Sequence, residues 1–135
     1  MSTPARILVV CDADSSTDAS VRALPTERFD VTTVHDTAAV CAAASDTDPS
    51  LVLLDLQMPG YGGFEVAGRL AVDHPGIPVL YLVGAGPHEQ LAQGFLLGDD
   101  LWLRSPAPPE ELARRLDAAL RDADLASASA AAVSV

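Results

Sequence analysis

The chain has 135 residues, which suits one domain of about 100–150 residues with its own core. Its formal charge is −11, and all eight basic residues are arginine. A surface this acidic repels phosphate backbones, so we expect no direct binding to DNA or RNA. The two cysteines form no disulfide framework, and neither a signal peptide nor a membrane-length apolar run is present. We therefore expect a cytoplasmic protein without membrane contact.

The first half of the chain predicts two strands, each followed by a helix. Residues 6–11 predict the first strand, because after Arg6 they form a continuous apolar run, as in strands buried on both faces of a parallel sheet. The helical stretch that follows is stopped by Pro25. Residues 29–34 are rich in β-branched side chains and predict the second strand. Asp36 is placed to cap the next helix, which Asp48 and its neighbours end.

The second half repeats this alternation three times. The predicted elements are strands at 51–54, 78–83 and 100–104, and helices after Gly63, at about 88–97, and from Pro108. Leu112, Leu116 and Leu120 recur at a spacing of four and mark the buried stripe of the last helix. The chain then becomes rich in Ala and Ser. We therefore predict a domain at residues 1–123 and a flexible tail or linker at 124–135.

Five alternations of strand and helix predict an α/β fold with a doubly wound, five-stranded parallel sheet and five helices. Ligands of such sheets bind beyond the carboxyl ends of the strands. In the strand order 2-1-3-4-5, Asp12 and Asp55 follow neighbouring strands and meet at one rim. Two close carboxylates resist joint ionisation unless a cation lies between them, and Mg²⁺ suits such oxygen ligands. The alternative is that both aspartates cap nearby helices.

Four stretches resemble the receiver domains of response regulators in order and spacing: RILVVCDAD, PSLVLLDLQMPGYGGFEVAGRL, IPVLYLVGA and GDDLWLRSPAPPEELARRLDAAL. The resemblance spans residues 6–121 and implies a flavodoxin-like fold. It implies that Asp55 accepts a phosphoryl group from a histidine kinase, a phosphotransfer protein or a small phosphodonor, since a carboxylate can act as the nucleophile. It also implies that Asp12, Asp55 and the carbonyl of Gln57 hold Mg²⁺, and that a cis peptide bond precedes Pro106.

Three positions depart from the family's pattern. Cys11 replaces the first of two adjacent acids, which predicts a weakened Mg²⁺ site. Val83 replaces a Thr or Ser whose hydroxyl would bond the phosphoryl group, a contact worth roughly 1.5–3 kcal/mol. Ser105 replaces a Lys, whose charge would attract the phosphoryl group by roughly 4 kcal/mol. Switching a two-state protein needs about 5.5 kcal/mol, so we predict phosphorylation of Asp55 with a weak conformational response.

Trp102 matches the position of an aromatic residue that, in receivers, moves together with the hydroxyl that Val83 replaces. The alternative is that Trp102 is a half-buried aromatic side chain that fills space at the rim of its strand. Phe95 and Leu96 make the predicted fourth helix unusually apolar. Together with Trp102 they suggest a homodimer or partner surface on the fourth helix, fifth strand and fifth helix. The alternative is that they are scattered apolar surface residues, which are common. Cys11 is expected to be a small buried residue rather than a redox or metal-binding thiol. The three histidines are scattered without ligand spacing.

Three functions are compatible with a fold of this class. The first is a receiver in a two-component phosphorelay, with no enzymatic activity of its own. The second is a pseudo-receiver that acts without phosphorylation, through protein contacts or a small ligand. The third, a flavodoxin-like enzyme or nucleotide binder, requires a glycine-rich phosphate loop after the first strand. Residues 12–15 contain no glycine and carry two acids, which disfavours the third function.

Overall fold

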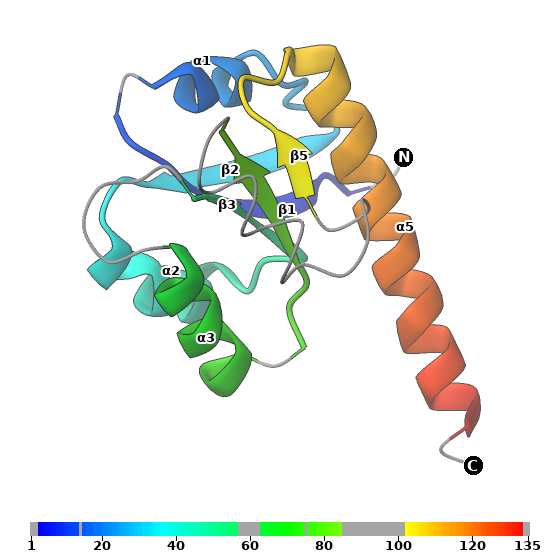
Figure 1. Cartoon of the computed structure of the whole chain (residues 1–135). Coiled ribbons are helices and arrows are strands. Elements are labelled where there is room, and N and C mark those ends of the chain that lie inside the picture. Colours follow the sequence, from blue (N-terminus) through cyan, green and yellow to red (C-terminus); the bar gives the residue numbers. More distant parts are fainter. Residues whose placement is uncertain (1–2, 14, 57–62, 75, 85–101, 134–135) are drawn as a thin grey trace.

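The computed structural model describes residues 3–13, 15–56, 63–74, 76–84 and 102–133. Its strands are β1 (Ala5–Val10), β2 (Phe29–Val34), β3 (Leu51–Asp55), β4 (Val79–Val83) and β5 (Trp102–Arg104). They pair in parallel in the order β2-β1-β3-β4-β5 (Figure 1). The predicted flavodoxin-like sheet and its strand order are therefore confirmed.

The strands form where apolar residues run without interruption. Every residue of β3 is buried, because this strand lies between β1 and β4 and has helices on both faces. The bounds of β2 agree with those predicted from its β-branched residues, and those of the other described strands differ by one or two residues. A run this apolar leaves Asp55, the last residue of β3, as the one charged side chain of the central strand.

The helices α1 (Ser16–Arg22), α2 (Val40–Thr47), α3 (Gly63–Asp73) and α5 (Pro109–Val133) are described, with a short 3₁₀ turn, η1, at Thr37–Ala39. Ser15 caps α1, and its hydroxyl accepts a hydrogen bond from the backbone N–H of Asp18. Asp36 acts as a cap as predicted, but it opens η1, which then leads into α2. Asp48 ends α2 in the left-handed conformation, with φ of 46°. The helix predicted at about 88–97 lies outside the described residues.

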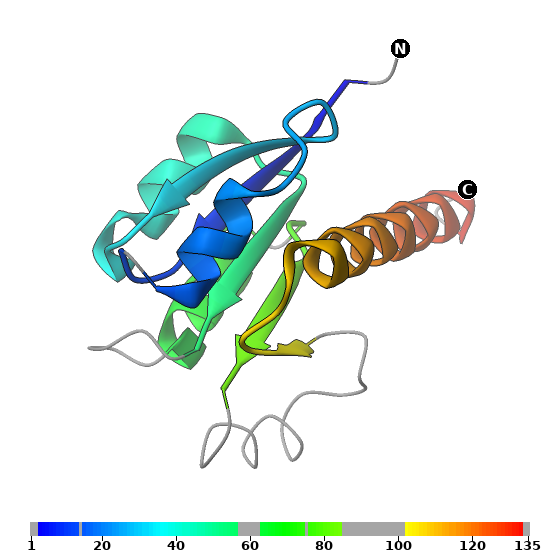
Figure 2. The same cartoon turned by 90° about the horizontal axis from the view of Figure 1, so that it is seen from above.

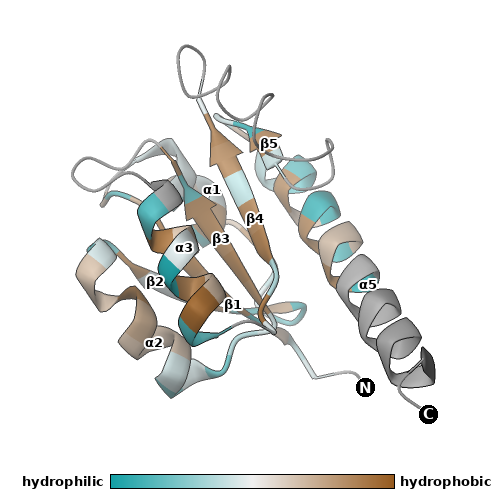
Figure 3. Ribbon diagram, turned by 60° about the horizontal axis from the view of Figure 1, so that its bottom comes forward, coloured by the Kyte–Doolittle hydropathy of each residue, from teal (hydrophilic) through white to brown (hydrophobic). Residues whose placement is uncertain are grey.

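The sheet separates two hydrophobic layers. Leu24 of the α1 end and Leu112 and Leu116 of α5 pack on one face, and Val40 of α2 and Leu70 of α3 pack on the other. Alternate residues of each central strand enter alternate layers, as the two-residue period of a strand requires. Apolar residues accordingly dominate the central strands in Figure 3. Helices on both faces leave the carboxyl edge of the strands as the place for polar chemistry.

The last helix continues into the segment 124–135, which we predicted to be a flexible tail or linker. Residues 124–133 of that segment continue α5 to Val133. The reason is composition, since alanine has the highest helix propensity of all residues. Leu112 and Leu116 are fully buried and Leu120 packs against the same layer, as the spacing of four predicted. Beyond them α5 extends past the sheet (Figures 1 and 2).

Within the described ranges, no helix combines the length and apolarity needed to span a bilayer.

Candidate functional site

Asp55 lies at the carboxyl end of the central strand and is only 4% exposed. Its neighbours in β3 determine its direction: Leu51 and Leu53 face the layer of α1 and α5, so Asp55 points to the same side. There the buried hydroxyl of Thr17, in α1, donates a hydrogen bond of 3.0 Å to Oδ2 of Asp55. A buried carboxylate is thus held by a neighbouring helix at the edge where ligands of this fold bind.

Cys11 and Asp12 follow β1, the neighbour of β3. The register pairs Val10 with Leu54, so Cys11 and Asp55 are the next residues on the two strands. Cys11 is fully buried, and the pKa of its thiol is raised to about 11, chiefly by burial and in smaller part by the charges of Asp18, Asp55 and Asp12, against the lowering effect of a hydrogen bond with Ser15. Three carboxylates therefore lie close enough to the thiol to oppose its ionisation.

Asp12 is half-buried, and its backbone is hydrogen-bonded to Ser15, the residue that caps α1. Its carbonyl oxygen accepts a hydrogen bond of 2.8 Å from the hydroxyl of Ser15 and one of 3.4 Å from the N–H of Ser15. The same hydroxyl caps α1 by accepting from Asp18. The loop after β1 is therefore shaped by Ser15, which leaves Asp12 at the rim next to buried Cys11.

Val83 and Ser105 follow on the other side of Asp55. Val83 ends β4, is fully buried, and packs in the layer of α2 and α3. Ser105 is buried directly after β5, and its N–H donates to the carbonyl of Val83 at 2.9 Å. The peptide bond between Ser105 and Pro106 is cis, which confirms the prediction made for this bond.

Trp102 and Arg104 lie on the edge strand β5. Trp102 is half-buried against the layer of α2 and α3, and its carbonyl accepts a hydrogen bond of 2.7 Å from Arg115 of α5. Arg104 is exposed and shares the strand face of Trp102. Asp55 faces the opposite layer, that of Leu51 and Leu53, so the alternation along β5 directs Arg104 away from the side of Asp55. Gln57, Phe95 and Leu96, which we assigned to the metal site and the partner surface, lie outside the described residues.

The structure adds residues that sequence reasoning missed. Thr17 and Asp18 are buried polar residues of α1, and Asp18 forms an ion pair with Arg22 at 2.9 Å. The available signal was the placement of Thr17 at a spacing of four from Val21, on the apolar face of a helix. His35, expected to stand apart from other metal ligands, has a ligand atom within 4.8 Å of those of Cys11 and Asp18.

Comparison with known proteins decides the family. The profile described as response regulator receiver domain matches residues 7–117. The chain belongs to the response regulator receiver family. Its place in two-component signal transduction follows from that membership, and receivers typically bind Mg²⁺ at an acidic site such as the rim formed here by the strand ends.

Curated relatives support this assignment. The probable transcriptional regulatory protein TcrX of Mycobacterium tuberculosis is 34% identical over 118 residues, which cover 87% of this chain and 50% of TcrX. The DNA-binding response regulator MtrA of the same species is 34% identical over 119 residues, which cover 88% of this chain and 52% of MtrA. The chain spans about half the length of the curated relatives it matches. Because MtrA is named as DNA-binding, this comparison gives no support to our expectation that nucleic acid is avoided.

Solved receiver structures have the same fold. The chemotaxis response regulator CheY4 of Vibrio cholerae superposes with a TM-score of 0.69 at 28% identity, covering 87% of this chain and 99% of that one. A CheY-like receiver domain from Methanospirillum hungatei has a TM-score of 0.75 at 21% identity and covers 90% of this chain and 97% of its own. NtrX of Brucella abortus has a TM-score of 0.80 at 26% identity, and the match covers 94% of this chain and 29% of NtrX.

Proposed function

We propose that this receiver accepts a phosphoryl group on Asp55 from a histidine kinase or phosphotransfer protein. The observation that supports this most directly is the position of Asp55, a 4% exposed carboxylate at the carboxyl end of β3. A carboxylate oxygen would attack the phosphorus of a phosphohistidine, the phosphorus–nitrogen bond would break, and an acyl phosphate would form on Asp55. The released imidazole takes up a proton from solvent.

Asp12 and Asp55 are the residues that would hold Mg²⁺, together with the backbone carbonyl of Gln57. Their oxygen donors fit a hard ion, and both carboxylates lie near enough to influence the same thiol. When bound, the ion would neutralise the negative charges that meet as a phosphoryl group approaches a carboxylate. Cys11, in place of a second acid, removes one charge from this set, so we infer that Mg²⁺ is held weakly.

The response to phosphorylation is the second part of the proposal. Val83 offers no hydroxyl and Ser105 no positive charge, so the two contacts that would pull on a phosphoryl group are absent. Their combined value, roughly 1.5–3 kcal/mol for the hydrogen bond and roughly 4 kcal/mol for the charge, matches the about 5.5 kcal/mol that a switch requires. We therefore infer that Asp55 is modified without the full rearrangement that such contacts drive.

A mass measurement tests the acceptor. The chain is incubated with Mg²⁺ and acetyl phosphate, and the intact mass is compared for the native chain, Asp55→Asn and the control Asp30→Asn. Asp30 is an exposed carboxylate of β2. We expect one added phosphoryl group on the native chain and on Asp30→Asn, and none on Asp55→Asn. Equal labelling of Asp55→Asn would refute the assignment of the acceptor.

A pseudo-receiver is the second candidate. The fully buried valine at the end of β4 supports it, since this position cannot contact a phosphoryl group by hydrogen bonding. In this alternative the domain acts through protein contacts or a small ligand, with Trp102, Phe95 and Leu96 as the proposed homodimer or partner surface. A chain that stays unlabelled with acetyl phosphate and with a kinase, yet keeps its fold, would favour this candidate over the first.

A further inference from the structure

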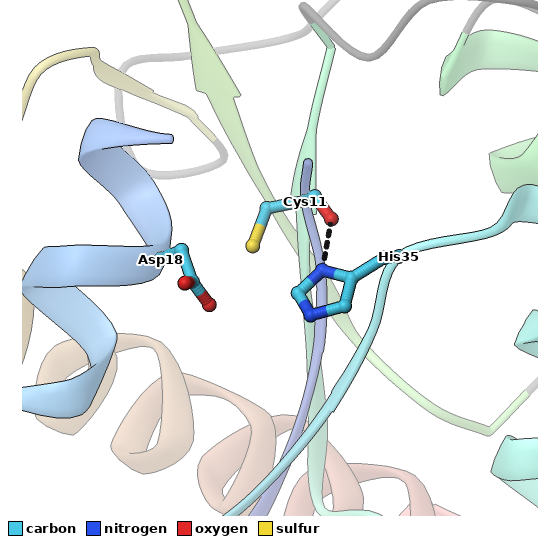
Figure 4. A group of neighbouring side chains, drawn as sticks. All are labelled: Cys11, Asp18 and His35. Carbon is cyan, nitrogen blue, oxygen red and sulfur yellow. Dashed lines mark hydrogen bonds between the residues drawn. The ribbon is translucent and has the colours of Figure 1, made fainter. Parts of the chain in front are cut away.

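Three side chains of different chemistry converge beside the predicted acidic site. Cys11, Asp18 and His35 bring a sulfur, a carboxylate oxygen and a ring nitrogen within 4.8 Å of one another (Figure 4). They come from the end of β1, from α1 and from the residue after β2, so only the fold brings them together. In the part of the chain that the structure describes, no other trio of Cys, His, Asp or Glu side chains meets in this way.

We propose that Cys11, Asp18 and His35 bind a thiophilic divalent metal ion of the zinc type. Thiolate and imidazole ligands suit zinc, whereas Mg²⁺ prefers oxygen alone. Metal–ligand bonds of about 2.0–2.3 Å place tetrahedral ligand atoms about 3.3–3.8 Å apart. Starting from separations within 4.8 Å, the three atoms reach this geometry by moving about 1 Å. The proton of the Cys11 thiol leaves to bulk water as the sulfur–metal bond forms.

His35 already has the orientation that a ligand requires. Its Nδ1 lies 2.9 Å from the backbone carbonyl of Cys11. A carbonyl oxygen only accepts, so Nδ1 carries the proton and donates it, which leaves Nε2 with the lone pair that binds a metal. Metal-binding histidines typically donate their other ring N–H to a carbonyl or carboxylate in this manner. In this case the carbonyl belongs to a second ligand residue, so His35 is fixed directly beside Cys11.

The other two ligands are buried, and His35 supplies the entry. Cys11 is fully buried, and the side chain of Asp18 is 5% exposed and held through Oδ2 by Arg22 at 2.9 Å. His35 is exposed, so an ion can reach the cluster from the solvent side of β2. Three protein ligands leave the fourth tetrahedral position to water, which makes this an open site rather than a closed structural one.

This site differs from the predicted Mg²⁺ site in its ligands. Asp12 and Asp55 offer oxygen to a hard ion, and neither belongs to the trio. The two sets have no ligand in common but lie close together, because the charges of Asp12, Asp18 and Asp55 all raise the pKa of Cys11. A divalent ion bound to the trio would counter this negative charge, which the chain cannot do with lysine because it has none.

Metal titration of the full chain tests the proposal. Co²⁺ serves as the spectroscopic probe, because thiolate ligation produces a sulfur-to-cobalt charge-transfer band and four-coordination produces strong visible bands. We expect one Co²⁺ per chain with both signals, displacement of Co²⁺ by Zn²⁺, and no displacement by an equal concentration of Mg²⁺. Absence of the charge-transfer band at saturating Co²⁺ would overturn the proposal.

Variants locate the ion. His35→Gln changes an exposed residue and leaves the core intact, and we expect it to weaken Zn²⁺ binding by at least about tenfold, the cost of losing even an outer-shell partner. Cys11→Ser should remove the charge-transfer band. The matched controls Cys41→Ser and His74→Gln, which change the half-exposed cysteine of α2 and a histidine after α3, should bind as the native chain does. Binding that survives His35→Gln but is lost in Asp12→Asn would place the ion at the acidic rim and refute the proposal.

Discussion

Thr17 of α1 and Asp55 of β3 are joined by a hydrogen bond of 3.0 Å between two buried side chains. Replacing Thr17 with valine keeps the shape and removes this donor to a charged group. We expect the free energy of unfolding at neutral pH to fall by about 1.5–3 kcal/mol, measured by urea denaturation. The control Thr32→Val changes a half-buried threonine of β2 and should cost less than about 1 kcal/mol. Equal losses in the two variants would contradict a specific role for Thr17.

Restoring the family's side chains at Val83 and Ser105 should strengthen the conformational response to a phosphoryl analogue. In Val83→Thr/Ser105→Lys the missing hydroxyl and charge return at the ends of β4 and β5, on the side of Asp55 away from β1. We expect Mg²⁺ with beryllofluoride to change the fluorescence of Trp102, the sole tryptophan, in the double variant and only weakly in the native chain. Each single variant should respond to an intermediate degree. A native chain that responds as strongly as the double variant would show that its switch is intact.

The thiol of Cys11 predicts a loss of stability at high pH. Its pKa is raised from 9.0 to about 11 in the folded chain, so between these pH values the unfolded chain holds fewer protons than the folded one. The stabilisation is present below pH 9.0 and is lost as the pH rises toward 11, by about 2–3 kcal/mol. Unfolding free energies of Cys11→Ala should decline less over this range and keep only the part that the raised pKa values of Cys41 and Tyr81 produce. Val10→Ala, a core truncation without an ionisable group, should be less stable throughout but retain it.

Restoring an acid at Cys11 predicts a change in metal preference. Cys11→Asp places a further carboxylate at a fully buried position near Asp12, Asp18 and Asp55. Without metal, we expect the chain to lose at least about 1 kcal/mol of stability, because these charges repel one another. Mg²⁺ should then bind about tenfold more tightly, a gain of about 1.4 kcal/mol, as measured by titration calorimetry. The control Cys41→Asp should leave the affinity for Mg²⁺ unchanged, and an unchanged affinity in Cys11→Asp would argue against an acidic rim around Asp12.

We predict that residues 124–135 contribute little to the free energy of unfolding of the domain. The buried residues Leu112 and Leu116, together with Leu120, hold α5 to the sheet, and all of them precede residue 124. Ending the chain after Ala123 should change the free energy of unfolding by less than about 0.5 kcal/mol while reducing the helical signal in circular dichroism. A loss of more than about 1 kcal/mol would show that residues 124–135 belong to the folded domain.

The sheet could be predicted because the apolar runs that form its strands are visible in short stretches of the sequence. A continuous apolar run such as 51–54 forms a buried strand wherever it lies, and short crossovers require parallel pairing. The helical conformation of residues 124–133 was not predicted, because Asp124 and the two serines suggested a linker, whereas the alanines among them favour helix.

The site was only partly predictable. The positions of Asp12 and Asp55 at one edge of the sheet were predictable because a topological rule places strand ends together. Thr17, Asp18 and His35 were missed because their proximity to Cys11 and Asp55 depends on how α1 and the end of β2 pack against the sheet. No spacing along the chain records that packing, although a threonine on the apolar face of α1 marks a buried polar contact.

A divalent ion bound at the proposed site beside Cys11 would link the folding equilibrium of the domain to the supply of that ion. An ion bound only by the folded chain at a hundred times its dissociation constant adds about 2.7 kcal/mol of stability, and a chelator removes it. The half-life of the protein against proteolysis would then follow the metal content of its surroundings, independently of any phosphoryl donor.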